Sequence, residues 1–277
     1  MLKSILLVLD DQGVDHGSVD MAIRWAVEFD ALLVGLGVID EDAVRPAEPV
    51  PLGAGQAKRE LDAHRLHQRQ VAVGSMLSAI ALRCADSRVA FKPLECIGRP
   101  AEEIGVEAQR FDLILMARQL QRPDMPGEWA ISDTLRTILR SAPRPVVAIP
   151  ELAPTGNGIV VAYDGSLQAA RTLFAFEASS LAARHPVHII SINDDPLEAA
   201  RRGNRAVEFL GTRGVRSTLS AETTVHPSEQ ILDFASEVDA GLIVLGAYGK
   251  SRIHEFFLGS VTSAVLAKCP LSLFLFH

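Results

Sequence analysis

The sequence predicts an α/β protein made of two tandem doubly wound domains, each with a parallel sheet flanked by helices. Of the 277 residues, 48% are hydrophobic but only 5% are aromatic, so Ala, Val, Leu and Ile dominate, which suits parallel strands covered by helices. Short apolar runs alternate with amphipathic stretches, which is typical of βαβ units around a buried sheet. The chain also contains an internal repeat, and its length is usual for two domains.

The repeat is clearest in residues 98–117 and 225–246. Each segment has a proline at a helix start (Pro100 and Pro227), then Glu and Ile, then an Asp-containing turn and an apolar strand. Proline is favourable at the first turn of a helix because its missing N–H has no intrahelical partner there. Two copies of one unit therefore fill the chain.

The two copies also begin alike. Residues 4–10 and 158–164 are apolar strands that end on an aspartate and lead into a helical pattern. Pro, Gly and Asn in the segment 151–158 mark a linker between the copies. We therefore predict domains at residues 1–151 and 152–277.

In the second copy, strands are expected where short apolar runs occur and helices where apolar residues recur with helical period. These runs and periods predict a right-handed, doubly wound layer with five strands. The expected elements are strand 158–163, helix 167–184, strand 187–192, helix 196–213, strand 216–223, helix 227–239, strand 241–245, helix 260–268 and strand 271–276.

The first copy is the longer one, and its excess falls within residues 40–71. This segment includes the Pro- and Gly-rich run VRPAEPVPLGAGQ, which we interpret as an irregular excursion that leads into a long polar helix. The last strands of the two copies, 145–149 and 271–276, are apolar edge strands that must be covered or paired.

Charge and cysteine content exclude several classes of function. The net charge of −7 provides no global positive field for nucleic acid or an anionic membrane. Cys84, Cys96 and Cys269 lie far apart without a C-x-x-C pair, which argues against a disulfide framework and a zinc ribbon. The apolar run at the N-terminus is too short for a signal peptide, and no stretch is long enough for a membrane span, so we expect a cytoplasmic protein.

The candidate ligand site follows the first and fourth strands of the second copy. In an open parallel sheet, ligands bind beyond the carboxyl ends of the strands, where the winding reverses. Asp164 follows the first strand; Gly246 and Gly249 follow the fourth and permit close backbone approach. Gly259 and Ser260 open a helix whose free N–H groups attract an anion, and the hydroxyls of Ser260 and Thr262 add donors. Together these parts predict a phosphate-binding site.

The spacing G-x2-G-x9-G-S after a strand, together with the aspartate of the first strand end, resembles the nucleotide-binding subgroup of the universal stress protein family. The resemblance covers essentially the whole chain as a tandem of two family domains. It implies five-stranded sheets in the order 3-2-1-4-5 and binding of ATP, ADP or AMP without a well-defined turnover reaction. In this family the last strands pair across dimers, so here we expect the two copies to pair within one chain as a pseudo-dimer, with a further homodimer as an open alternative.

The resemblance also assigns residues of the second copy to the nucleotide. Asp164 would contact the ribose or, through Mg-ATP, the metal–phosphate cluster, and backbone at Ala162 and Ile192 would border the adenine. Tyr248 stands where many family members have histidine; Tyr163 and Tyr248 contact the nucleotide or are ordinary half-buried tyrosines. No catalytic residue and no metal site built by the protein alone is expected. The full expected set is Ala162, Tyr163, Asp164, Ile192, Leu245, Gly246, Tyr248, Gly249, Gly259, Ser260, Val261 and Thr262.

The first copy departs from this pattern. Ala117 and Leu120 replace the first two glycines, and Ser132 with Asp133 replaces the Gly-Ser pair, although Asp10 is kept. A carboxylate at a phosphate position repels the ligand. We therefore expect ATP in the second copy only.

Two functions remain open at this stage. The first is a stress-response module whose nucleotide state tunes its contacts with partners. The alternative is a slow ATPase or nucleotide-processing enzyme, with Asp164 helping to hold Mg²⁺ and Ser260 near the γ-phosphate. Lys250 and Arg252, in the glycine loop, could reach the β- and γ-phosphates, whereas Arg201, Arg202 and Arg205 are interpreted as an exposed helix face.

Overall fold

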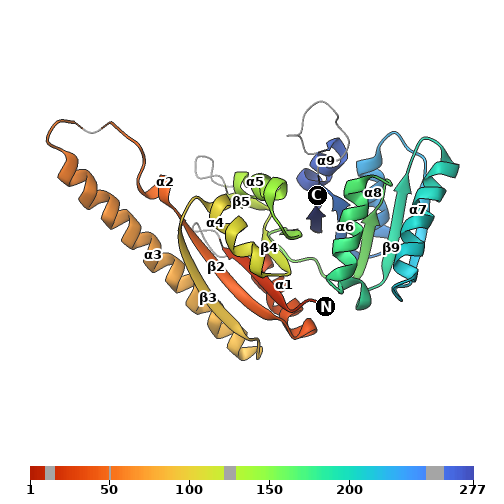
Figure 1. Cartoon of the computed structure of the whole chain (residues 1–277), viewed down its shortest axis with the longest axis horizontal. Coiled ribbons are helices and arrows are strands. Elements are labelled where there is room, and N and C mark those ends of the chain that lie inside the picture. The colour runs from red at the N-terminus through yellow and green to blue at the C-terminus, as the bar shows by residue number, and fades with distance from the viewer. Residues whose placement is uncertain (10–15, 50, 122–128, 248–258) are drawn as a thin grey trace.

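The computed structural model describes residues 1–9, 16–49, 51–121, 129–247 and 259–277. In the first half of the chain (Figure 1) the elements are β1 (Ser4–Leu9), α1 (His16–Phe29), β2 (Leu32–Asp40), α2 (Glu41–Val44), α3 (Gly55–Asp86), β3 (Phe91–Gly98), α4 (Pro100–Glu107), η1 (Ala108–Arg110), β4 (Leu113–Ala117), β5 (Gln119–Gln121), β6 (Trp129–Ile131), α5 (Asp133–Ser141) and β7 (Val146–Ile149).

In the second half the elements are β8 (Gly158–Ala162), α6 (Leu167–Ala178), η2 (Leu181–Ala183), β9 (Val187–Ile192), α7 (Pro196–Gly211), β10 (Ser217–Glu222), α8 (Pro227–Glu237), β11 (Ala240–Gly246), α9 (Ser260–Lys268) and β12 (Ser272–Phe276).

The strand order confirms the expected fold in both halves. The large sheet has the order β10-β9-β8-β11-β12-β7-β4-β1-β2-β3, so each half follows the pattern 3-2-1-4-5. Within each half all neighbouring strands are parallel. The division of the chain at residues 151 and 152 stays a prediction.

The last strands of the two halves pair with each other at the centre of the sheet. β12 and β7 run antiparallel, with Leu273 opposite Ala148, Phe274 opposite Val147 and Leu275 opposite Val146. The two five-stranded sheets are thereby joined into one sheet of ten strands. The expected pairing within one chain is confirmed, and it removes two apolar edges from solvent.

Helices cover both faces of this sheet. Successive residues of a strand point to opposite faces, so Leu7 packs in one core cluster and Leu6 in the other. One cluster contains buried residues of α1, α3, α6 and α7, and the other contains buried residues of α4, α5, α8 and α9. The apolar composition of the strands therefore follows from burial on both faces.

The end of α6 and one hairpin differ from the expectation. The helix expected at 167–184 ends at Ala178, because Ser180 adopts a left-handed conformation (φ +65°) before the short η2. The hairpin of β5 and β6 was not expected; it lies where the second half has its glycine loop.

The excursion and the long polar helix are found as expected, with the short α2 added before them. α3 has 32 residues and is about 48 Å long, whereas its neighbour β2 has nine residues and spans about 30 Å. The first buried residue of α3 is Val73, so the helix reaches beyond the sheet at its N-terminal end, as Figure 1 shows.

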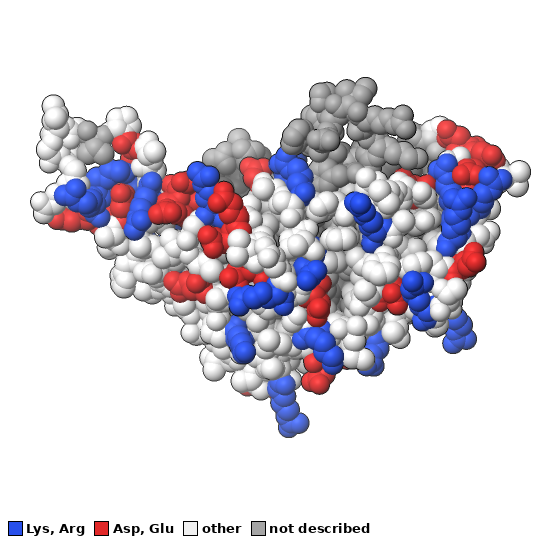
Figure 2. Space-filling model, viewed as in Figure 1, with Lys and Arg blue, Asp and Glu red and all other residues white. Residues whose placement is uncertain are grey.

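The surface carries intermixed charges on the face drawn in Figure 2. Along α3, Lys58 lies 3.5 Å from Asp62, and along α7 Arg201 lies 2.9 Å from Glu198. Such pairs between neighbouring turns of one helix contribute little to stability. Within the described ranges, none of the helices has both the length and the apolar character needed to cross a membrane.

The three cysteines differ in accessibility. Cys84 and Cys269 are buried, and Cys96 is half-buried on β3 at the edge of the sheet. Burial raises the pKa of Cys84 to about 11, and burial likewise raises the pKa values of Cys269 and Cys96. All three thiols therefore favour the protonated, unreactive form near neutral pH, and access distinguishes them.

From this difference we expect an aromatic disulfide reagent to label Cys96 first in the native protein and all three thiols after unfolding. The rate for Cys96 should increase with pH because the thiolate is the reactive form. The absorbance of the released aromatic thiolate measures the reaction. Cys96→Ser should remove the labelling that occurs in the native protein. Native labelling that persists in Cys96→Ser would contradict the expectation.

Candidate functional site

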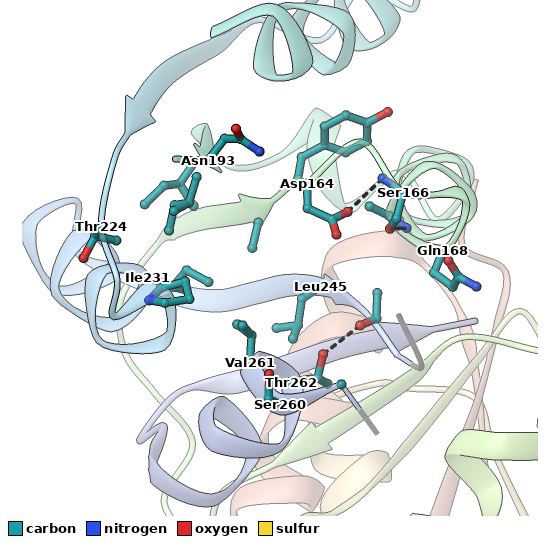
Figure 3. Close-up of a pocket in the computed structure, with 18 of the residues that line it drawn as sticks. Asp164, Ser166, Gln168, Asn193, Thr224, Ile231, Leu245, Ser260, Val261 and Thr262 are labelled. Atoms are coloured by element: carbon teal, nitrogen blue, oxygen red, sulfur yellow. Dashed lines mark hydrogen bonds between the residues drawn. The ribbon is translucent and has the colours of Figure 1, made fainter. Parts of the chain in front are cut away.

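A pocket of about 420 Å³ lies at the carboxyl ends of β8, β9 and β11 in the second half. It opens between β8 and β11, where the winding of the sheet reverses, and this is the usual ligand position in such sheets. Figure 3 shows side chains from both sides of this opening pointing into it. The lining comprises Ala162, Tyr163, Asp164, Ser166, Gln168, Ala169, Ile190, Ile192, Asn193, Asp194, Thr224, Pro227, Ile231, Leu245, Gly246, Gly259, Ser260, Val261 and Thr262.

The pocket brings together every expected site residue that the structure describes. Tyr248 and Gly249 lie outside the described residues, as do Lys250 and Arg252. The expected residues in the lining are Ala162, Tyr163, Asp164, Ile192, Leu245, Gly246, Gly259, Ser260, Val261 and Thr262.

The loop after β8 fixes the carboxylate of Asp164. Its Oδ1 accepts a hydrogen bond of 2.8 Å from the N–H of Ser166, and Gly165 between them has φ +76°. The hydroxyl of Ser166 accepts a bond of 3.1 Å from the N–H of Ala169 and so caps α6. This local turn, drawn in Figure 3, explains why the sequence needs Asp-Gly-Ser here.

Arg202 holds the same loop from α7. Its Nη1 donates to the carbonyl oxygen of Asp164 at 3.1 Å, and its Nε donates to Oε1 of Glu198 at 2.8 Å. The hydrogen bond from Arg202 lowers the pKa of the Glu198 carboxyl. The interpretation of Arg202 as part of an exposed face is therefore wrong, because its half-buried side chain fixes the turn at the pocket. Sequence spacing gives no signal for this contact.

The N-terminus of α9 forms the opposite wall. Gly259 is its N-cap residue and has no side chain to cap the first turn, so those N–H groups can face an anion. Thr262 is buried, and its hydroxyl donates to the carbonyl oxygen of Gly246 at 3.0 Å. The expectation of a free hydroxyl donor is thus wrong for Thr262, because a hydroxyl has one hydrogen. Its backbone N–H remains in the first turn of the helix.

Gly246 is required by close packing between β11 and α6. A Cβ at this position would lie 3.1 Å from the backbone nitrogen of Ala169 and 3.3 Å from Cβ of Gln168. A larger residue would push α6 away from the strand end and alter the pocket between them.

The inner part of the pocket is apolar. Its surface is formed by Ala162, Ile190, Ile192, Ile231, Leu245 and Val261. Such a surface suits a flat aromatic base, while the ends of the strands supply polar groups for the rest of a ligand.

Asn193, Asp194 and Thr224 also line the pocket and were not expected. The side chain of Asn193 accepts a bond of 3.0 Å from the N–H of Asp195, and that of Thr224 accepts one of 3.0 Å from the N–H of His226. They follow β9 and β10, so their position after neighbouring strands was the available signal.

Tyr163 is a largely buried residue at the end of β8. Burial raises the pKa of its phenol, although Arg205 opposes the shift. The phenol is therefore neutral at physiological pH. Both interpretations of Tyr163 remain compatible with its place in the lining.

The described lining is acidic, with the carboxylates of Asp164 and Asp194 and no lysine or arginine among its described members. A polyphosphate here needs positive charge beyond the dipole of α9. Oxygen donors such as carboxylates and hydroxyls suit Mg²⁺, so Asp164 and Ser260 are chemically fitted to a magnesium–nucleotide complex.

The corresponding edge of the first half is built differently. The backbone N–H of Arg118 donates to the carbonyl oxygen of Ile149, and that of Ala247 donates to the carbonyl oxygen of Phe276. These bonds are equivalent in the two halves, so Ala117 corresponds to Gly246. At α5 the hydroxyl of Ser132 accepts a bond of 3.3 Å from the N–H of Leu135. The N-terminus of α5 is therefore capped by the side chain of its N-cap residue, whereas that of α9 has no side-chain cap.

Apolar side chains are also buried at that edge of the first half. Val38, Ile104 and Met116 are buried in the core cluster there. What distinguishes the halves here is Asp133 in the first turn of α5, which places a carboxylate where α9 has Ser260.

Comparison with known proteins agrees with the fold. The family model described as "Universal stress protein family" matches residues 157–277. The universal stress protein Slr1230 of Synechocystis sp. is 30% identical over 171 residues, which cover 60% of this chain and 58% of that protein.

Solved structures share the architecture over the whole chain. A universal stress protein from Archaeoglobus fulgidus has a TM-score of 0.74 at 18% identity and covers 99% of this chain and 97% of its own. A functionally unknown protein from Pseudomonas aeruginosa PAO1 has a TM-score of 0.63 at 16% identity and covers 99% and 92%. Residues 157–277 thus match the universal stress protein family, and the whole chain has the fold of these solved structures.

Proposed function

We propose that this protein binds one adenine nucleotide, ATP or its products ADP and AMP, in its second half and acts as a cytoplasmic stress-response module. The observation that carries the proposal is the pocket in which an apolar floor faces the uncapped N-terminus of α9. Nucleotide state would tune the contacts of the protein with its partners.

Each part of the nucleotide has a complementary part of the pocket. The base packs on the apolar floor near Ala162 and Ile192, and the ribose lies near Asp164. The phosphates lie at the N–H groups of Ser260 and Val261, where the helix dipole favours negative charge. Magnesium, when bound, neutralises the phosphates next to Asp164; the turn with Ser166 keeps that carboxylate oriented.

Calorimetric titration with ATP, ADP and AMP in the presence of Mg²⁺ tests the proposal. We expect one nucleotide per chain, because the two halves differ at Gly259 and Ser132. The control Ser132→Ala should bind as the unaltered protein does. Two equivalent sites per chain, or no binding of any of the three nucleotides, would overturn the proposal.

Single-turnover phosphate release separates a binding module from the slow ATPase. Turnover that is lost in Asp164→Ala would favour the enzyme. A further homodimer also stays a prediction, which sedimentation with and without ATP would measure.

A further inference from the structure

A second cavity, of about 330 Å³, lies at the junction of the two halves. It is formed by α1, by the segment 155–158 between the halves, by η2 and by the first residues of β8 and β11. It is therefore at the amino ends of the strands, whereas the nucleotide pocket is at their carboxyl ends. The two cavities are separate sites.

The floor of this junction cavity is apolar and comes from both halves. Met21 and Trp25 of α1 lie against Leu181 and Leu242 of the second half, and all four side chains are buried. Their packing in one core cluster makes the floor a preformed surface.

The wall beside the floor is backbone held in close contact. A Cβ at Gly241 would lie 2.2 Å from the carbonyl oxygen of Gly156, and a Cβ at Gly156 would lie 2.6 Å from that of Asp239. These glycines let the linking segment lie directly on the start of β11. The cavity is thus bounded by chain that cannot easily move inward.

The rim carries two guanidinium groups. Arg24 donates to the carbonyl oxygen of Pro154 at 3.4 Å, and Arg184 lies over the ring of Phe29 at 5.9 Å. Both side chains are exposed, and neither pairs with a carboxylate of the described residues. They are therefore available to an anion.

The one carboxylate of the lining is already engaged. Oε1 of Glu28 lies 3.3 Å from Nε2 of His185, whose Nδ1 lies 2.6 Å from Oδ1 of Asn157. These contacts link α1 to the second half. Among the lining residues, Arg24 and Arg184 are then the positive charges without a carboxylate partner. The acidic nucleotide pocket has the opposite balance, although the whole protein has a net charge of −7.

From these observations we infer that the junction cavity is a second ligand site, which takes a small organic anion with an apolar body and a carboxylate. The body packs on Trp25 and Leu181, and the carboxylate lies between Arg24 and Arg184. Cavities of this size that combine an apolar floor with polar groups and lie between domains are typical small-molecule sites. A charge-assisted bond to a guanidinium supplies the selectivity for an anion.

Tryptophan fluorescence tests this site directly. The chain has two tryptophans, Trp25 and Trp129, so Trp129→Phe leaves the cavity residue as the only reporter. The probe is 4-nitrobenzoate, whose nitro group quenches indole, and the uncharged control is 4-nitrobenzyl alcohol. We expect saturable quenching by the anion and only weak, non-saturating quenching by the alcohol.

Variants of the rim then identify the contacts. In the Trp129→Phe background, Arg24→Gln and Arg184→Gln should each weaken binding about tenfold, as expected for loss of one charge-assisted bond. The matched control is Arg140→Gln, an exposed arginine on α5 far from the cavity lining. Saturable quenching that both rim variants leave unchanged would overturn the inference.

Two further outcomes would also overturn it. Equal quenching by the alcohol would mean that the cavity does not select an anion. Displacement of the probe by saturating ATP, with loss of quenching, would mean that the probe occupies the nucleotide pocket. Quenching that persists at saturating ATP supports separate sites.

Discussion

Gly259→Asp is expected to abolish nucleotide binding without destabilising the fold. Gly259 has φ −54° and ψ 147°, an ordinary extended conformation that aspartate adopts easily. Aspartate is a preferred N-cap residue, so its carboxylate would accept the first N–H groups of α9. Those groups would then be lost to the phosphates, and the new charge would repel them.

We expect the affinity for ATP to fall at least about 100-fold, which corresponds to roughly 2.7 kcal/mol. Thermal unfolding without nucleotide should stay unchanged or rise slightly, because a side-chain cap replaces a bare one. Calorimetry and a thermal melt measure the two effects. Loss of ATP affinity without a lower melting temperature would show that the variant loses the site and keeps the fold.

The matched control places the same residue at the same helical position of the first half. Ser132→Asp exchanges one good N-cap for another at α5, and we expect no change in ATP affinity. If Ser132→Asp abolished binding while Gly259→Asp did not, the nucleotide would belong to the first half, and the proposed site would be wrong.

Phe274→Ala is expected to cause the largest loss of stability among single core substitutions at the junction. Phe274 is fully buried in β12, and its ring meets that of Phe176 edge-on at 5.8 Å. It also lies opposite Val147 of β7 in the pairing that joins the halves. Truncation removes a large apolar side chain and leaves a cavity that neighbouring strands cannot close.

The expected decrease in the free energy of unfolding is about 3–5 kcal/mol. Urea unfolding followed by circular dichroism measures it. The control is Phe174→Ala on α6; this residue is 57% exposed, and the centroid of its ring lies 6.4 Å from that of Phe209. We expect this control to lose less than about 1.5 kcal/mol, because part of the ring is already in water. Equal losses would show that the junction core adds no special stability.

Much of the fold was accessible from sequence because its signals are local and repeated. The run at β11 and the helix starts at Pro100 and Pro227 follow from apolar periodicity and from the missing N–H of proline. The end of α6 was misplaced because Ser180 takes a left-handed conformation. Serine rarely adopts this conformation, so the sequence does not signal it. The β5–β6 hairpin was missed although Pro126 and Gly127 mark a turn between its strands, because each strand has only three residues.

Some residues of the candidate site could be predicted from the sequence, and others could not. The glycines and Asp164 were accessible from sequence because each reflects a requirement of its own loop, after β11 and after β8. Asn193, Thr224 and Arg202 were not, since each reaches the pocket from a different element and its role depends on distance in space. The donor role expected for the Thr262 hydroxyl failed for the same reason, because its partner Gly246 lies 16 residues away.

The sequence by itself determined the repeat, the order of strands and helices, and the difference between Gly259 and Ser132, since these follow from residue type and spacing along the chain. Only the tertiary structure decided the register in which β12 and β7 pair, the hydrogen bond from the hydroxyl of Thr262 to Gly246, and the second cavity between α1 and η2. The physical reason is that local preferences act over a few residues, whereas pairing, hydrogen-bond competition and cavities depend on which distant surfaces are buried together.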